Sequence, residues 1–245
     1  MSIGIIGGTG LADIKGLKII AEKKLKTPFG SPSAHYIIGK LKEKKVIFLA
    51  RHGNPHCIPP HKVNYRANIW GFQKLGVTHI IAITAVGGIT KKMQPAHIVI
   101  PDQIIDYSYG REHTFFADDL DDVTHIDFTY PYTQKLRQRL ITIAAEKKIA
   151  ISSVATYGCT QGPRLESAAE IVRLEKDGCD IVGMTGMPEA GLARELNLPY
   201  VGISVVANWG AGKVAGEITM EEIHQHLNNG MGNVMQLLTA FIKKT

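Results

Sequence analysis

The sequence has few cysteines and no long apolar run. Cys57, Cys159 and Cys179 are its only cysteines among 245 residues, and three widely spaced thiols are typical of a reducing cytoplasm rather than of a disulfide framework. No stretch reaches the roughly 18 to 20 consecutive apolar residues of a membrane span, and the N-terminus lacks the pattern of a secretory signal. We therefore expect a soluble, cytoplasmic protein without a membrane partner.

Charged residues are also sparse, at 20% of the chain against 44% hydrophobic residues. This composition excludes intrinsic disorder and supplies one large core, so we expect a single domain over residues 1–245. The formal net charge is +6, and nine lysines between residues 15 and 45 provide much of it. No aromatic stacking platform or zinc-ligand spacing accompanies these lysines, which indicates solvent-exposed faces of short antiparallel strands and no nucleic-acid partner.

Apolar runs that end in glycine-containing turns alternate with segments of helical spacing. This alternation predicts an α/β fold, a single domain with a central mixed β-sheet flanked by helices. The pattern predicts strands at residues 3–7, 46–50, 79–86, 151–156, 179–184 and 200–207, and helices at 61–75, 136–147, 167–176, 188–196 and 220–244.

Small, hydroxyl and cationic residues follow four of the predicted strands. These turns are Gly8-Thr9-Gly10, Arg51-His52-Gly53, residues 84–88 and Met184-Thr185-Gly186. In open α/β sheets ligands bind beyond the carboxyl ends of strands, and hydroxyls, exposed backbone N–H groups and an arginine suit a tetrahedral oxyanion. The turns therefore predict a phosphate site.

Other motifs are weaker. His52, His56, Cys57 and His61 lie in a proline-rich loop without a supporting carboxylate, so we expect no metal there. Cys159 has no activating base nearby and is interpreted as a buried structural thiol. Asn208 ends an apolar strand with an amide that can donate and accept, which suits a purine edge, although a helix cap is the alternative.

Taken together, several segments resemble the trimeric purine nucleoside phosphorylases and their 5′-methylthioadenosine phosphorylase branch. The similarity covers essentially the whole chain, in family order, and its fold is of the nucleoside phosphorylase type. The matching segments are Ile6-Gly-Gly-Thr-Gly, Arg51-His-Gly, Val63-Asn-Tyr-Arg-Ala-Asn-Ile-Trp, Gly162-Pro-Arg-Leu-Glu-Ser, Asp180-Ile-Val-Gly-Met-Thr-Gly-Met-Pro-Glu and Ala193-Arg-Glu.

The resemblance implies phosphorolysis, in which inorganic phosphate attacks the ribosyl C1′ of a purine nucleoside as a co-substrate. It also implies a homotrimer that acts in purine salvage and needs neither a metal nor an organic cofactor. By motif, Met184 would lie against the ribose, and the phosphate-binding residues would be Thr9, Arg51, His52, Thr84, Ala85 and Thr185.

The base-binding residues of the resembling families differ, and this chain matches the 6-oxopurine enzymes. Methylthioadenosine phosphorylases carry Asp-x-Asp where this chain has Asn208 and Gly210. The 6-oxopurine enzymes have the asparagine, and a glutamate that corresponds to Glu166. The resemblance gives Glu166 and Asn208 the catalytic base contacts, because a carboxylate accepts N1–H of hypoxanthine but mismatches the unprotonated N1 of adenine.

At the 5′ end the sequence resembles the methylthio branch. Met220 and Ile223 are apolar where that branch builds its methylthio pocket, and His125 matches a residue that a neighbouring subunit contributes. We therefore expect S-methyl-5′-thioinosine and phosphate to give hypoxanthine and 5-methylthioribose 1-phosphate. The alternatives are a general inosine or guanosine phosphorylase, a methylthioadenosine phosphorylase, a nucleosidase that uses water, and a non-catalytic nucleotide-binding module.

Overall fold

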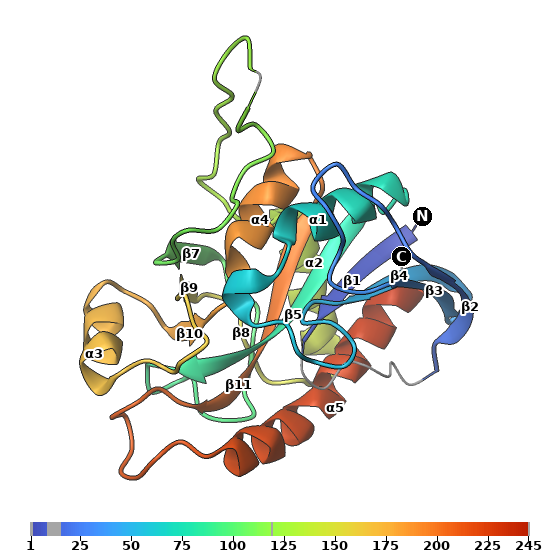
Figure 1. Cartoon of the computed structure of the whole chain (residues 1–245). Coiled ribbons are helices and arrows are strands. Elements are labelled where there is room, and N and C mark those ends of the chain that lie inside the picture. The colour runs from blue at the N-terminus through green and yellow to red at the C-terminus, as the bar shows by residue number, and fades with distance from the viewer. Residues whose placement is uncertain (1, 9–15, 119, 245) are drawn as a thin grey trace.

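One mixed β-sheet runs through the protein (Figure 1). The computed structural model describes residues 2–8, 16–118 and 120–244. The strands are β1 (Ser2–Gly7), β2 (Lys18–Lys23), β3 (Tyr36–Leu41), β4 (Lys44–Ala50), β5 (His79–Gly88), β6 (Ile98–Val99), β7 (Gln103–Asp106), β8 (Ile151–Ser152), β9 (Thr156–Cys159), β10 (Ile181–Gly183) and β11 (Tyr200–Trp209). The helices are the 3₁₀ turn η1 (Pro60–Lys62), α1 (Tyr65–Lys74), α2 (Gln134–Glu146), α3 (Ala168–Lys176), α4 (Gly186–Glu195) and α5 (Met220–Lys244).

The strand order places the parallel strands at the centre of the sheet. The order is β2-β3-β4-β1-β5-β10-β9-β7, while β11 pairs with β5 and β6, and β6 pairs with β8. Strand β1 is parallel to β4 and β5, and β11 is parallel to β5. The carboxyl ends of these four strands therefore meet at one edge of the sheet, where the sequence predicted a ligand.

Alternate residues of the central strands pack against opposite helical layers. Ile3 and Ile5 belong to the core that α2 and α5 cover, whereas Ile6 belongs to the core beneath α1 and α4. Strand β5 divides in the same way, with Ile81 on the first side and Ile80 on the second. The two-residue period of a strand thus explains why these segments are apolar at every position.

The predicted α/β class and mixed sheet are confirmed, but several boundaries were wrong. Helix α1 begins at Tyr65 rather than at residue 61, because the Asn64 side chain accepts a hydrogen bond from the Ala67 N–H and caps the helix. Strand β5 continues through Gly87 and Gly88, which pair with β10 and β11.

The predicted strand at residues 151–156 is two strands, and two short strands were missed. Strand β8 pairs with β6, whereas β9 pairs with β7 and β10, so the chain changes partners between them. Strands β6 and β7 have only two and four residues, too few for a period to appear in the sequence.

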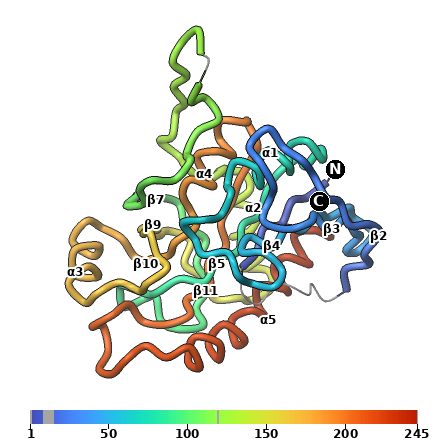
Figure 2. The backbone as a smooth tube through the Cα atoms, in the orientation of Figure 1, coloured from blue at the N-terminus to red at the C-terminus, as the bar shows by residue number. Residues whose placement is uncertain are grey.

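The lysine-rich N-terminal segment forms the antiparallel edge that the sequence predicted. Strand β2 pairs with β3, and β3 with β4, both antiparallel, and every residue of β2 is exposed. After β7 the chain leaves the body of the molecule in a long excursion before α2 (Figure 2). Across the described ranges, none of the helices has the length and apolarity needed to traverse a bilayer.

Candidate active site

A cavity of about 580 Å³ lies at the carboxyl edge of the central strands. It brings together most of the residues that the sequence selected, although they are scattered over about 170 positions of the chain. Its lining includes Arg51, His52, Thr84, Ala85, Glu166, Met184, Thr185, Asn208, Met220 and Ile223. Thr9 lies outside the described residues. His125 is exposed on the excursion after β7 and does not line this cavity within the single chain.

Hydroxyl and backbone groups line one end of the cavity. Ala85 is the exposed position in the otherwise buried strand β5, so backbone rather than a large side chain faces the space there. The Thr84 hydroxyl lies 2.8 Å from Ser204 Oγ, which fixes its position. Thr185 precedes α4, but its side chain makes no capping hydrogen bond. These neutral groups can donate to an anion.

Arg51 is 1% exposed and is tied to a carboxylate that the sequence did not single out. Its Nε and Nη2 donate to the two carboxylate oxygens of Glu189 at 2.7 and 2.9 Å, and Nη1 donates to the Ile83 carbonyl at 3.0 Å. Burial lowers the pKa of Arg51, but Glu189 raises it by more, so the guanidinium stays charged. Tyr200 donates to Glu189 from the other side.

This ion pair changes the electrostatics predicted for the anion end. Arg51 is the principal cation that the sequence predicts for this end, whereas Glu189 compensates most of that charge within the wall. Glu189 belongs to the Asp180-to-Glu189 motif, yet nothing in the local pattern identifies it as the partner of a residue 138 positions earlier. The neutral donors are therefore the groups at this end that remain available to an anion.

His52 is held in a fixed orientation beside this pair. Its Nδ1 lies 2.8 Å from the Ile58 carbonyl oxygen, which can only accept, so Nδ1–H donates. Burial, with the charge of Arg51, lowers the pKa of His52 to about 4, and the ring is neutral at pH 7. Nε2 then carries a lone pair. The ring stacks on His56 with centroids 4.6 Å apart.

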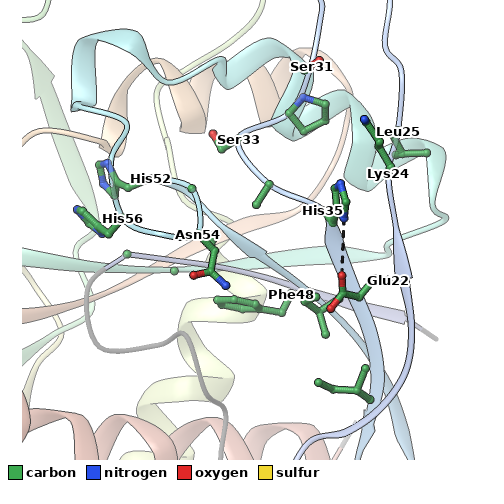
Figure 3. A pocket seen from close by; sticks show the side chains of 18 of the residues that line it. Glu22, Lys24, Leu25, Ser31, Ser33, His35, Phe48, His52, Asn54 and His56 are labelled. Carbon is green, nitrogen blue, oxygen red and sulfur yellow. Dashed lines mark ion pairs between the residues drawn. The ribbon is translucent and has the colours of Figure 1, made fainter.

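A second cavity of about 780 Å³ adjoins the first through Gly8, His52 and His56 (Figure 3). Its other walls come from β2, β3 and the segment between them. Glu22 and His35 approach within 3.6 Å across it. The histidine pair therefore stands at the junction between the two cavities.

Asn208 and Glu166 line another part of the first cavity. A register shift between Val206 and Asn208 forms a bulge in β11 and brings Asn208 opposite Gly87, and such bulges re-aim side chains. One Nδ2 hydrogen of Asn208 is donated to the Trp209 carbonyl at 2.7 Å, which leaves Oδ1 and the second hydrogen for a ligand. The helix-cap alternative for Asn208 is wrong, because the residue lies within β11.

Apolar side chains complete the lining. Met220 and Ile223 lie one turn apart at the start of α5, and Met220 is 62% exposed. Met184 packs so closely against Gly162 that a Cβ on that glycine would lie 2.4 Å from Met184 Sδ. The Gly162 φ of +62° also favours glycine.

Arg111 is a second residue that the sequence analysis missed. It is buried and donates to four backbone carbonyls from two loops of the cavity wall: Met184 and Met187 at 2.9 and 2.6 Å, and Thr160 and Gln161 at 3.1 and 2.9 Å. Its guanidinium therefore holds the two loops together. A buried arginine carries no sequence signal that distinguishes it from an exposed one.

The cysteine and histidine motifs have structural explanations. Cys159 is fully buried, and burial raises the pKa of its thiol to about 12, which leaves no thiolate for nucleophilic attack. In the part of the chain that the structure describes, no group of three or more His, Cys, Asp or Glu side chains could hold a metal ion. The absence of a metal in the working protein stays a prediction.

Comparisons with known proteins agree on one kind of enzyme. A family model described as Phosphorylase superfamily matches residues 2–243. The chain is 55% identical over 238 residues, 97% of each sequence, to a probable S-methyl-5′-thioinosine phosphorylase of Pseudomonas syringae pv. tomato. It is 41% identical to the 6-oxopurine nucleoside phosphorylase of Pyrococcus furiosus, over 98% of this chain and 91% of that protein.

A solved structure with the same fold is methylthioadenosine phosphorylase from Schistosoma mansoni in complex with adenine. The two structures align with a TM-score of 0.94 at 31% sequence identity, over 98% of this chain and 90% of the other.

Proposed function

Because this chain belongs to the Phosphorylase superfamily, we propose that it catalyses the phosphorolysis of a 6-oxopurine nucleoside, with S-methyl-5′-thioinosine as the preferred substrate. A phosphate oxygen forms a bond to C1′ while the C1′–N9 bond breaks and its electron pair passes to the purine. The purine takes a proton from solvent, and the products are hypoxanthine and 5-methylthioribose 1-phosphate. The proposal places this reaction in purine salvage in the cytoplasm.

The observation that carries the proposal is the composition of the single cavity of about 580 Å³. Its lining combines the hydroxyl groups of Thr84 and Thr185, the polar side chains of Glu166 and Asn208, and the apolar side chain of Met220. A nucleoside has three corresponding parts, which are the reacting C1′, the base and the 5′ substituent. Such a site needs neither a metal nor an organic cofactor.

At the anion end, Thr84, Ala85 and Thr185 are proposed to hold phosphate beneath C1′, together with Arg51, His52 and Thr9. A phosphate dianion there stabilises the positive charge that develops on the ribosyl ring in the transition state. Neutral His52 offers Nε2 as an acceptor for a phosphate or sugar hydroxyl. The compensated Arg51 contributes orientation and the remaining hydrogen on Nη1.

At the base end, Glu166 is proposed to accept N1–H of hypoxanthine. Asn208 would donate to O6 and accept the N7–H that forms as the base departs. Adenine offers a lone pair at N1 and a donor at position 6, so both contacts would be mismatched. The adenine bound to the Schistosoma mansoni enzyme is therefore a poor guide to the base preference of this chain.

At the 5′ end, Met220 and Ile223 favour a methylthio group over a hydroxyl, because their apolar side chains can contact the thioether and offer a hydroxyl no hydrogen-bond partner. We also propose a homotrimer in which His125 of one copy reaches the 5′ end of a neighbouring site. The runner-up is a general 6-oxopurine nucleoside phosphorylase, which the relationship to the Pyrococcus furiosus enzyme supports.

A substrate panel measured with and without phosphate tests the proposal. Inosine differs from methylthioinosine only at the 5′ position, and methylthioadenosine differs from methylthioinosine only at C6. We expect kcat/KM to be highest for methylthioinosine and turnover to require phosphate. A preference for methylthioadenosine would contradict the base assignment, a preference for inosine would favour the runner-up, and turnover without phosphate would indicate a nucleosidase.

A further inference from the structure

Glu166 stands in the wall between two cavities. One side of it lines the cavity of about 580 Å³ described above, and the other side lines a smaller cavity of about 280 Å³ next to α3. Thr160 and Arg164 line the smaller cavity and do not line the larger one. The Glu166 carboxylate therefore borders two spaces into which it could turn, and the proposed function places the nucleoside base in the larger one.

The Thr160 hydroxyl holds the Glu166 carboxylate from the smaller cavity. Thr160 Oγ1 donates to Glu166 Oε1 at 2.6 Å, a short charge-assisted hydrogen bond. Among the described residues, it is the one donor within hydrogen-bonding distance of this carboxylate. Because the Thr160 hydroxyl engages Oε1, Oε2 remains available to accept a hydrogen bond from a base.

The position of that hydroxyl is fixed by the backbone of Thr160. Its N–H donates to the Gly183 carbonyl of β10 at 2.8 Å, and its carbonyl accepts from Arg111 at 3.1 Å. Glu166, by contrast, lies in a loop without regular structure between β9 and α3. A rigid strand end thus supports a carboxylate on a loop.

Two arginines line the smaller cavity, and one of them, Arg164, attracts the Glu166 carboxylate. Arg164 pairs with Glu170 at 2.7 and 2.8 Å and also interacts electrostatically with Glu166. Arg173 lies 3.7 Å from Asp177 and lines the same space. Without the Thr160 hydroxyl, Glu166 would be drawn toward the Arg164 guanidinium and away from the base.

We propose that Thr160 is a positioning residue for base selection: its hydroxyl keeps Glu166 turned toward the nucleoside cavity, so that the carboxylate can recognise N1–H of a 6-oxopurine. Thr160 does not contact the nucleoside and acts through Glu166. The inference rests on the proposed function and extends it by naming the device that orients the specificity-determining carboxylate.

The test compares Thr160→Val, which keeps the branched shape but removes the donor, with Thr160→Ser, which keeps the donor. The readouts are kcat/KM for methylthioinosine, KM for phosphate, and the dissociation constant of hypoxanthine by calorimetry. We expect Thr160→Val to lower kcat/KM and hypoxanthine affinity by roughly 10- to 100-fold, with phosphate KM unchanged within about twofold. Thr160→Ser should remain within about threefold of the unmodified chain.

A double-mutant cycle separates positioning from general damage to the fold. In a Glu166→Gln background, Thr160→Val should have little further effect on hypoxanthine affinity, because the group through which it acts is already altered. Equal activity of Thr160→Val and the unmodified chain would overturn the inference. An equal loss with Thr160→Ser, an additive loss in the Glu166→Gln background, or a matching rise in phosphate KM would also overturn it.

The failure of this inference and the failure of the proposed function appear in different measurements. The substrate preference of the unmodified chain tests the function. The difference between the valine and serine variants tests the role of Thr160.

Discussion

At the residue scale, the side chains of the proposed anion end differ in how firmly other protein groups hold them. Arg51 is largely satisfied by Glu189 and the Ile83 carbonyl. Thr185, in contrast, occupies a capping position without making the capping hydrogen bond. The Thr185 side chain lines the cavity and interacts with Tyr157, but no charged partner holds it as Glu189 holds Arg51. That contrast makes Thr185 the sharper probe of the proposed phosphate site.

Thr185→Val should raise KM for phosphate by about tenfold or more, because a hydrogen bond to an anion is lost without a change in side-chain size. The KM for the nucleoside should change far less. Steady-state kinetics with each substrate varied in turn provides the measurement. Thr142→Val, on the exposed face of α2, is the control, and an unchanged phosphate KM in Thr185→Val would contradict the assignment.

His79 links stability to pH. Its side chain is 4% exposed, and burial, with the charge of Arg139, lowers its pKa from 6.5 to about 4. The unfolded chain therefore binds a proton that the folded chain excludes between these values, and stability falls as the pH drops from about 6.5 toward 4. The contribution of His79 is about 2 kcal/mol between pH 7 and pH 5.

His79→Leu should remove that part of the acid sensitivity. Urea unfolding at pH 7 and at pH 5 measures the loss of unfolding free energy for both chains. We expect a smaller loss for the variant, whereas an identical loss would show that folding does not lower the pKa of His79.

At the element scale, α5 contains two glycines whose surroundings differ. A Cβ on Gly230 would lie 2.5 Å from Val205 Cγ1 and 3.2 Å from the Ala96 carbonyl oxygen. A Cβ on Gly232 would meet nothing within 4 Å. Helix propensity favours alanine at both positions, so the packing of α5 against β11 decides the sign at Gly230.

Gly232→Ala should stabilise the protein by about 0.5 to 1 kcal/mol, since alanine loses less backbone freedom in a helix. Gly230→Ala should destabilise it by about 1 to 3 kcal/mol through overpacking. Thermal or urea unfolding of the two variants gives the comparison. The same sign for both substitutions would mean that α5 does not pack on β11 as closely as described.

At the scale of the whole molecule, the excursion after β7 carries five of the twelve exposed large apolar side chains among the described residues. Those side chains are Tyr109, Leu120, Val123, Ile126 and Tyr130. The segment projects from the body of the molecule (Figure 1), and exposure of this many apolar groups to water is typical of a protein–protein contact. It is the natural contact between copies in the proposed homotrimer, and it carries His125.

Val123→Asp should therefore weaken the assembly. Val123 is 74% exposed, and Val154→Asp is a matched control because Val154 is 75% exposed on the connection between β8 and β9. Sedimentation equilibrium should give a trimer for the unmodified chain and the control, and smaller species for Val123→Asp. A monomer for the unmodified chain would exclude the trimer and the contribution of His125 from a neighbour.

The sequence by itself determined the fold class and much of the site. Buried strands, capped helices and glycine turns are local patterns, and the period of a few contiguous residues is enough to reveal them. Because parallel strands end at one edge of a sheet, strand-end residues such as Thr185 and Asn208 could be assigned to one cavity from the sequence. The family motifs added Glu166.

Only the tertiary structure decided how those residues are held. Glu189 compensates Arg51 across 138 positions, Arg111 binds the backbone of two segments, and the Thr160 hydroxyl holds the Glu166 carboxylate. Strands β6 and β7 are likewise defined by pairing, β6 with β8 and β11, and β7 with β9. Each of these features depends on which distant segments the folded chain brings within hydrogen-bonding distance, and no local period or composition encodes that proximity.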